Sequence, residues 1–317
     1  MKKLVALLSV MILFGAALCG CGATSDADDI EDNGEGIRTT PEADEYYDRL
    51  ISCKDQIEAM TDFKPDIAIV LGSGLGDYVE QENLEIVETI SYDKIDGWPM
   101  STAPNHAGNL VFAKYKGLNL AIMQGRVHYY EGYTMAEVVL PLRVLHLMGA
   151  ETCILSNAAG AINADYHVGD FVCVEDQITS FVPSPLIGEN IDELGDRFVG
   201  MTDVFDAEMR ETVLKVGEEN NIPVHTGVYL QVTGPQYETP TEIKMYRSLG
   251  ADTVAMSLGV EVIAAAHMGM KVCAINCISN MAAGMETEGF SEDSIEDNMK
   301  ETSRKLQVLI NGLLDSF

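Results

Sequence analysis

Basic residues are scarce in this sequence. It contains 20 lysines and arginines against 50 aspartates and glutamates, which gives a formal net charge of −30. Proteins that bind nucleic acid neutralise its phosphates with lysine and arginine side chains. The charge balance therefore excludes nucleic acid as a natural partner. A small anionic substrate would have to be held by a local site, because the overall field of the protein opposes its approach.

The cysteines do not follow a disulfide or zinc-binding pattern. Apart from Cys19 and Cys21 near the start, five remain: Cys53, Cys153, Cys173, Cys273 and Cys277. Five is an odd number, four of them lie in apolar strand-like runs, and paired C-x-x-C spacing is missing. We therefore predict buried core thiols and no metal site.

The longest apolar run is confined to the N-terminus. Lys2 and Lys3 precede a run from Leu4 to Leu18 that is short for a membrane span, which predicts a signal peptide at residues 1–20. The segment LCGC that ends at Cys21 resembles a bacterial lipobox, in which the last cysteine is acylated. The expected location is thus outside the cytoplasm, with a lipid anchor in a bacterial membrane. An ordinary signal peptide with a coincidental cysteine is the alternative.

The next segment, residues 21–45, is acidic and almost free of large apolar side chains. Such a segment cannot bury enough surface to offset its chain entropy, so we predict a disordered tether. The folded part is expected at residues 46–317, which is long enough for one large α/β domain.

Short apolar runs alternate with helical patterns through this domain. Strands are predicted at 67–71, 118–123, 152–156, 170–174, 228–232, 253–256 and 272–277. Helices are predicted after a cap at Thr134 and at 206–219, 238–249, 260–268 and 295–314. The pattern indicates a single α/β domain whose central, mostly parallel or mixed β-sheet is flanked by helices on both faces.

Polar clusters follow six of the predicted strands. In chain order they are GSGLG, QGRVHYYEGY, NAAG, TGPQYET, MS and ISN. In sheets of this kind, ligands bind at the carboxyl ends of the strands. The repeated placement predicts one common site at that edge.

The glycine-rich segment GSGLG, residues 72–76, allows three interpretations: a dinucleotide fingerprint, a tight turn or an anion-binding loop. The third glycine comes one residue early for G-x-G-x-x-G, which argues against the first. Gly72 and Gly74 permit close approach of the backbone, and Ser73 offers a hydroxyl group. The segment alone leaves the turn and the anion loop open.

Arg126 and His128 favour the anion site. They stand two residues apart, so an extended backbone places both side chains on one face. Arginine presents a forked donor that matches phosphate oxygens, and imidazole adds another donor. A surface arginine beside a structural histidine is the alternative, but both follow an apolar strand and lie near His106 in NHAGNLVFA.

Nine segments together resemble the trimeric, low-molecular-mass purine nucleoside phosphorylases. They are LGSGLGD, HAGNLVF, GRVHYYEGY, SNAAGAIN, GDRF, TGPQYETPTE, GAD with VAMS, EVIAAAHMGM and ISNMAAGM, in the order found in that family. The resemblance implies the nucleoside phosphorylase fold, a homotrimer and a role in purine salvage. The implied reaction converts orthophosphate and a purine nucleoside, with inosine and guanosine preferred, into ribose 1-phosphate and free base. It implies no metal and no organic cofactor, since orthophosphate is a co-substrate.

The resemblance also implies roles for individual residues. The phosphate contacts would be Ser73, His106, Arg126, His128, the backbone at Ala158, and Ser257. Tyr130 and Met256 would line the ribose, Tyr237 would lie against the purine, Glu238 would accept its N1–H, and Asn280 would bond N7 and the 6-oxo region. Asn280, Glu238 and His128 are the implied catalytic residues. Loss of Arg126 is expected to weaken phosphate binding while folding stays largely intact.

The sequence departs from the family pattern in two places, and one family residue has only a candidate here. The family pattern M-S-T-V-P-E is replaced by MSLGVE at residues 256–261, so Ser257 is kept while the start of the following helix changes. Glu292 stands where the family usually has a histidine that reaches the ribose 5′-hydroxyl, so 5′ preference is not inherited. Phe181 is a candidate for the aromatic residue that a neighbouring subunit supplies.

Two other functions remain open from the sequence. A hydrolytic nucleosidase on a related fold would use water and would not need an anion site. A surface lipoprotein could bind nucleosides without turnover, which is a common task for anchored proteins.

Overall fold

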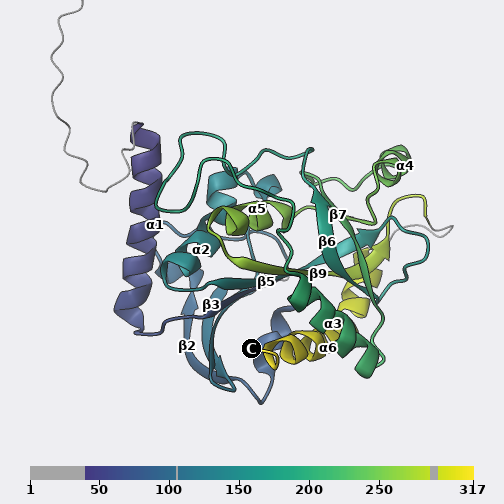
Figure 1. The fold of residues 1–317 in the computed structure, drawn as a ribbon, viewed down its shortest axis with the longest axis horizontal. Coiled ribbons are helices and arrows are strands. Elements are labelled where there is room, and N and C mark those ends of the chain that lie inside the picture. The colour runs from purple at the N-terminus through teal and green to yellow at the C-terminus, as the bar shows by residue number, and fades with distance from the viewer. Residues whose placement is uncertain (1–39, 105, 286–291) are drawn as a thin grey trace, which may run out of the picture. The chain divides into compact units, whose positions relative to one another are not determined.

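Nine strands form one mixed sheet in the computed structural model, which describes residues 40–104, 106–285 and 292–317 (Figure 1). The strands are β1 (Ile67–Leu71), β2 (Glu85–Ser91), β3 (Asn109–Tyr115), β4 (Leu118–Gln124), β5 (Thr152–Ala161), β6 (Phe171–Ile178), β7 (Val224–Gln231), β8 (Thr253–Ala255) and β9 (Lys271–Met281). Their order is β2-β3-β4-β1-β5-β8-β7-β6-β9, and β5 also pairs with β9. These pairings close β5, β8, β7, β6 and β9 into a ring.

Helices cover both faces of the sheet, which confirms the predicted α/β class. They are α1 (Pro41–Met60), α2 (Met135–Leu147), α3 (Ala207–Glu219), α4 (Pro240–Ser248), α5 (Gly259–His267) and α6 (Glu292–Leu314). One apolar core joins residues of α1, α2 and α5 to one face of the sheet, and a second joins α3 and α6 to the other.

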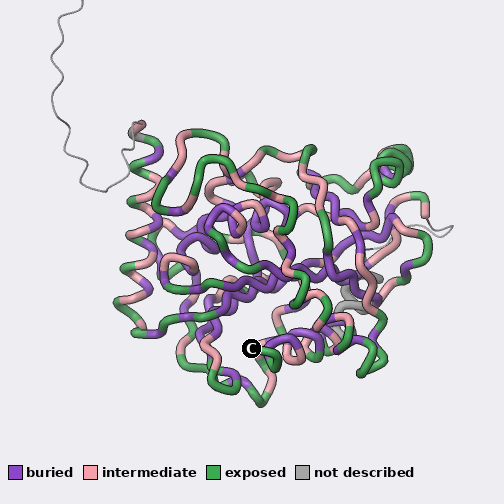
Figure 2. The backbone as a smooth tube through the Cα atoms, in the orientation of Figure 1, coloured by how far each residue is buried: buried purple, intermediate pink, exposed green. Residues whose placement is uncertain are grey.

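The buried strand β1 shows how the sequence builds these two cores. Ile67, Ile69 and Leu71 pack into the core that contains α3 and α6, whereas Ala68 and Val70 pack into the core that contains α1 and α2. Side chains alternate along a strand, so a strand covered by helices on both faces needs an unbroken apolar run. In Figure 2 the central strands are the most continuously buried part of the chain.

The strands β1, β4, β5 and β9 are mutually parallel where they pair, so their carboxyl ends meet at one edge. Two of them are longer than predicted. The segments NAAG and ISN, expected as loops, continue strands β5 and β9. They pair with each other through the strand backbone, in parallel register.

Strands β2 and β3 and helix α1 were not predicted from the sequence. β2 is mostly exposed and therefore lacks an apolar run, while β3 forms a hairpin with β4. Helix α1 begins at Pro41, before the expected boundary at Tyr46. The predicted signal peptide, Cys21 and the expected tether up to residue 39 lie outside the described residues.

The five predicted core cysteines, Cys53, Cys153, Cys173, Cys273 and Cys277, are buried with free thiols, which confirms their assignment to the core. Among the helices that the structure describes, each is too short or too polar to cross a bilayer.

Candidate functional site

A cavity of about 330 Å³ opens at the edge where the parallel strands end. Ten residues predicted to contact phosphate or nucleoside line it: Ser73, Arg126, His128, Tyr130, Ala158, Tyr237, Glu238, Met256, Ser257 and Asn280. They come from segments at or near the carboxyl ends of β1, β4, β5, β7, β8 and β9. The structure therefore gathers in one place residues that are distant in sequence.

The glycine-rich loop approaches β5 at Gly72. A β-carbon there would lie 2.7 Å from the Asn157 Cα and 3.0 Å from the Ser156 carbonyl oxygen, so a larger residue would push the loop away. Gly74 has a φ of 73°, in the left-handed region that glycine tolerates. The two glycines thus place Ser73 at the cavity wall, as an anion-binding loop requires.

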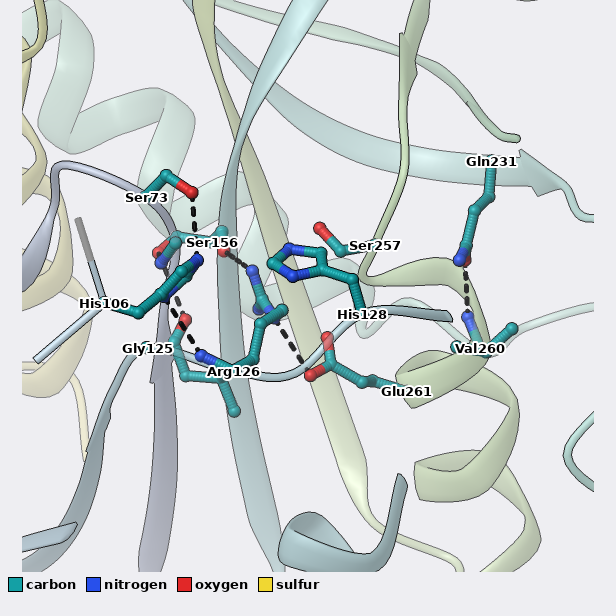
Figure 3. A network of polar contacts seen from close by, with 12 residues as sticks. Ser73, His106, Gly125, Arg126, His128, Ser156, Gln231, Ser257, Val260 and Glu261 are labelled. Carbon is teal, nitrogen blue, oxygen red and sulfur yellow. Dashed lines mark hydrogen bonds and ion pairs between the residues drawn. The ribbon is translucent and has the colours of Figure 1, made fainter. Parts of the chain in front are cut away.

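His106 lies behind Ser73 and connects it to Arg126 (Figure 3). Its Nε2 is 3.0 Å from the Ser73 Oγ, and its Nδ1 accepts a hydrogen bond from the Arg126 backbone N–H at 3.2 Å. Burial, with the nearby positive groups, lowers the pKa of His106 to about 3, so the ring is neutral at neutral pH. Because Nδ1 accepts, Nε2 carries the proton and donates to Ser73, whose own hydroxyl proton stays free for a ligand.

Space for the His106 ring depends on Gly125. This glycine has a φ of 104°, and a β-carbon on it would lie 2.4 Å from the His106 Nδ1. His106 itself supports the cavity wall without lining it.

The Arg126 guanidinium is buried and only partly paired. Its side chain is 1% exposed; Nε donates to the Glu261 Oε1 at 3.0 Å, and Nη1 donates to the Ser156 carbonyl oxygen at 2.6 Å. Nη2 has no hydrogen-bond partner among the described residues. A buried cationic donor is costly without a partner, so this N–H, on a residue that lines the cavity, is suited to bind an anion.

His128 is oriented by Glu131. The Glu131 Oε1 lies 2.9 Å from the His128 Nδ1 and also accepts from the His128 backbone N–H at 2.7 Å. Burial of the carboxyl group raises its pKa, but hydrogen bonds from His128 and Thr102 outweigh that effect and lower the pKa to about 2. The ionised carboxylate therefore holds a proton on Nδ1, so that Nε2 can accept a hydrogen bond from the O–H of a monoprotonated phosphate. The ring stacks on Tyr130 with centroids 4.7 Å apart.

Ser257 completes the polar end of the cavity at the start of α5. Its backbone oxygen accepts a hydrogen bond from the buried Tyr229 hydroxyl. Leu258, which follows, has a φ of 76° and is fully buried. A positive φ is costly for a branched side chain, so the surrounding contacts hold this turn in place.

A β-bulge brings Asn280 into the cavity. Ala159 pairs with Ile278 and Gly160 with Asn280, so Ser279 is an extra residue in β9. Neighbours in a regular strand face opposite sides, whereas this bulge lets both Ser279 and Asn280 line the cavity. The Ser279 Oγ donates to the Asn280 Oδ1 at 2.9 Å, and the Asn280 Nδ2 donates to the Met281 carbonyl oxygen at 3.0 Å.

The other end of the cavity is formed by residues between β7 and α4. Tyr237 is 49% exposed and lies at its open side, and Glu238 is next to it in the wall. Burial raises the pKa of Glu238 above that of an ordinary glutamate. A carboxyl group that is partly withdrawn from water favours a ligand that can donate a hydrogen bond to it.

Several residues of the site were not found from the sequence. Glu131, Glu261 and Ser279 act through other side chains. Glu131 and Ser279 lie in the motifs of their partners, His128 and Asn280, whereas Glu261 lies 135 positions from Arg126. Asn157 is 2% exposed and lines the cavity, with its Nδ2 unpaired within the described chain. The signal that could have found Glu261 is a lone acidic residue within the apolar stretch GVEVIAAA.

Phe181 is not part of this cavity as the single chain presents it, and the place of Glu292 relative to the cavity is not described. Phe181 packs against Tyr246 with ring centroids 5.3 Å apart and does not line the cavity. Glu292 begins α6, and its side chain lies outside the described residues. Within the ranges that the structure describes, no three or more His, Cys, Asp or Glu side chains group in a way that could hold a metal ion.

The geometry of the cavity separates two kinds of chemistry. One end presents a buried cationic N–H, two hydroxyls and a histidine, which suit an oxyanion. The other presents an amide, a carboxyl group and a tyrosine ring, which suit a flat heterocycle with hydrogen-bonding edges. A ligand that carries such a heterocycle could thus lie with the rest of its atoms next to the bound oxyanion.

Comparisons with known proteins agree with this geometry. Residues 66–315 match the family model described as Phosphorylase superfamily. The chain is 38% identical over 271 residues to purine nucleoside phosphorylase 1 of Bacillus subtilis, covering 83% of this chain and 99% of that protein. Purine nucleoside phosphorylase of Schistosoma mansoni has been solved in complex with adenosine and with inosine. Those structures share 32% and 31% identity with the chain, each with a TM-score of 0.78, and cover 84% and 85% of it and 96% of their own chains.

Proposed function

The chain belongs to the phosphorylase superfamily and, within it, to the purine nucleoside phosphorylases, and from this premise we propose that inosine and guanosine are its preferred substrates. The enzyme cleaves purine nucleosides with orthophosphate, as in purine salvage. The bond between C1′ of the ribose and N9 of the base breaks, and a phosphate oxygen takes its place at C1′. The products are ribose 1-phosphate and the free purine.

The polar end of the cavity is proposed to bind the phosphate. Ser73, the Nη2 of Arg126, His128 and Ser257 would hold this anion below the sugar, together with the backbone at Ala158. Positive charge develops on the ribose as the glycosidic bond breaks, so a fixed anion stabilises the transition state and also supplies the nucleophile. The observation that supports this assignment best is the unpaired, buried Nη2 of Arg126 in the same cavity as Asn280 and Glu238.

The experiment that tests this function follows inosine cleavage by the purified protein with and without orthophosphate. We expect hypoxanthine and ribose 1-phosphate to appear only when phosphate is present. Turnover that does not depend on phosphate would establish a hydrolytic nucleosidase instead. Binding of inosine with no release of hypoxanthine at saturating phosphate would establish a nucleoside-binding protein without turnover.

Glu238 is proposed to set the base preference. Its carboxylate would accept the N1–H that hypoxanthine and guanine carry, whereas adenine presents an unprotonated N1. A mispaired buried polar group costs on the order of 1–3 kcal/mol, so inosine and guanosine should react faster than adenosine.

Replacement of Glu238 by glutamine should therefore lower kcat/KM for inosine more than for adenosine. The raised pKa of Glu238 adds a pH effect: as pH falls, the carboxylate protonates at a higher pH than an exposed glutamate would, and kcat/KM for inosine declines. The Glu238→Gln variant should lack this acidic limb. Equal losses for the two nucleosides, or an unchanged pH profile, would contradict the assignment.

A homotrimer with an aromatic side chain shared between subunits is proposed from the family resemblance. Phe181 is 38% exposed in the single chain and is our candidate for that side chain. Sedimentation of the purified domain tests the assembly, and a monomer with full activity would rule it out.

We also propose that Cys21 is acylated and anchors the enzyme at the extracytoplasmic face of a bacterial membrane. The anchor would not change the proposed reaction, in which orthophosphate is the only co-substrate. Replacement of Cys21 by serine should move the protein from the membrane fraction to the soluble fraction of the native cells. Unchanged fractionation would argue against the anchor.

A further inference from the structure

The first turn of α5 supports the phosphate end of the cavity from two sides. Ser257 immediately precedes this turn, and Glu261 lies within it and pairs with the Nε of Arg126. The N-cap residue, Leu258, provides no side-chain hydrogen bond to the helix. The first N–H groups of a helix lack partners inside the helix, so a buried first turn needs acceptors from elsewhere.

Gln231 supplies one of these acceptors (Figure 3). Its Oε1 accepts the Val260 backbone N–H at 2.9 Å, and the side chain is 1% exposed. Gly259 makes the approach possible, because a β-carbon there would lie 2.9 Å from the Gln231 Oε1 and 2.8 Å from the Thr179 Cγ2. Gln177 adds a hydrogen bond from its Nε2 to the Gly259 carbonyl oxygen at 3.2 Å.

Strand β7, which contains Gln231, also contacts Ser257, the residue that precedes the turn. Tyr229 and Gln231 stand two residues apart, on one face of β7, and Tyr229 donates to the Ser257 carbonyl oxygen. One face of β7 therefore fixes the backbone on both sides of Leu258. The positive φ of Leu258 lies between these two anchors.

We propose that Gln231 is a positioning residue for the phosphate site: it holds the first turn of α5, and through Glu261 it holds Arg126. This inference rests on the proposed phosphate role of Arg126. Gln231 lies outside the cavity wall and is assigned no contact with either substrate. Its loss should therefore change the binding of phosphate and leave the binding of nucleoside nearly unchanged.

The segment MSLGVE indicates how the proposal can be tested. A proline in the first turn of a helix has no N–H to satisfy and has its φ preset for the helix. Proline at position 260 would therefore remove the backbone N–H that donates to the Gln231 Oε1. The preceding Gly259 has no β-carbon, so the usual clash between a proline ring and the residue before it is reduced. Gln231 and Val260 thus form a pair in which the second change should compensate for the first.

The test compares Gln231→Met, Val260→Pro and the double variant with the unaltered enzyme. Gln231→Met keeps the side-chain length but leaves the Val260 N–H unpaired, and it should raise the KM for phosphate about tenfold. The KM for inosine should stay within about twofold, and the double variant should recover the phosphate KM to within about twofold of the unaltered enzyme. Val260→Pro alone removes the same hydrogen bond and places the proline Cδ against the Gln231 Oε1, so it should also raise the phosphate KM and lower the melting temperature.

Tyr166→Phe is the matched control. It removes one buried hydrogen bond to the same strand, from the Tyr166 hydroxyl to the Thr226 carbonyl oxygen at 2.8 Å, at the end away from Gln231. This control should lower the melting temperature without changing the phosphate KM. The positioning role is refuted if Gln231→Met also lowers the melting temperature without changing the phosphate KM. It is refuted as well if the double variant does not recover the phosphate KM of the unaltered enzyme.

Two further outcomes separate this inference from the proposed function. If the unaltered enzyme turns over inosine without phosphate, the assigned reaction fails whatever Gln231 does. If the unaltered enzyme depends on phosphate but Gln231→Met keeps its phosphate KM, only the positioning role fails. Should Gln231→Met be insoluble, a folded double variant with a normal phosphate KM supports the proposal, and a double variant that stays insoluble contradicts it.

Discussion

Replacing Arg126 with alanine is expected to raise the KM for phosphate and to lower kcat/KM for phosphorolysis by about 10²–10³-fold. The reason is that Nη2 is a buried, charged donor without a partner among the described residues, and Arg126 lines the cavity together with Ser73 and Ser257. Initial rates at varied phosphate and fixed, saturating inosine measure the effect. Phosphate kinetics within a factor of two of the unaltered enzyme would remove Arg126 from the anion site.

The structure also changes what this variant should do to folding. The sequence suggested that folding would stay largely intact, but Arg126 and Glu261 form an ion pair whose side chains are 1% and 3% exposed. Removing one partner leaves a buried charge unpaired, which typically costs about 3–5 kcal/mol. Arg126→Ala should therefore unfold at a lower temperature, and its lower stability adds to the loss of activity.

A double variant separates the two effects. Arg126→Met with Glu261→Leu replaces the pair by apolar side chains of similar size, and such replacements of buried pairs are often neutral or stabilising. We expect this variant to melt near the temperature of the unaltered enzyme and still to show the full loss of phosphate binding. Recovery of phosphate kinetics together with stability would mean that Arg126 serves the fold alone.

The second large effect is expected at Asn280. Replacement by alanine should lower kcat for inosine by about 10²–10³-fold, because the amide would no longer stabilise the charge that develops at N7 of the leaving purine. The KM values should change much less, since the interaction strengthens as the bond breaks. Single-turnover measurements of hypoxanthine release report the chemical step directly.

Asn163→Ala is the corresponding control outside the cavity. Asn163 donates from its Nδ2 to the Asp252 Oδ1 at 2.9 Å and does not line the cavity, so its loss should affect stability and leave kcat nearly unchanged. If Asn280→Ala keeps kcat within about twofold of this control, the amide has no part in the chemical step.

The sequence predicted the centre of the sheet better than its edges. β1 was predicted at its observed bounds because it is buried on both faces and needs an uninterrupted apolar run. β2 was missed because most of its side chains are exposed, so its pairing with β3 leaves little trace in the residue pattern. β5 and β9 were ended too early, because the asparagine and glycine of NAAG and the serine and asparagine of ISN are typical of turns and loops.

In the site, residues that line the cavity were easier to predict than residues that hold them in place. Residues that touch the cavity were found because they sit in motifs at strand ends, as Ser73 does in GSGLG and Arg126 does in QGRVHYY. Glu261 was missed because it acts on Arg126, which lies 135 positions earlier in the chain. Such a contact depends on the pairing of strands and helices, which local sequence patterns do not encode.

The bulge at Ser279 has a consequence for how this enzyme would be re-engineered. Ligand-facing positions in a strand normally recur at every second residue, so libraries that alter selectivity often vary alternate positions. In β9 two consecutive positions, Ser279 and Asn280, share the wall, and the hydroxyl of one holds the amide of the other. Varying one position alone would break their hydrogen bond, so new base selectivity should be sought by randomising the two positions jointly.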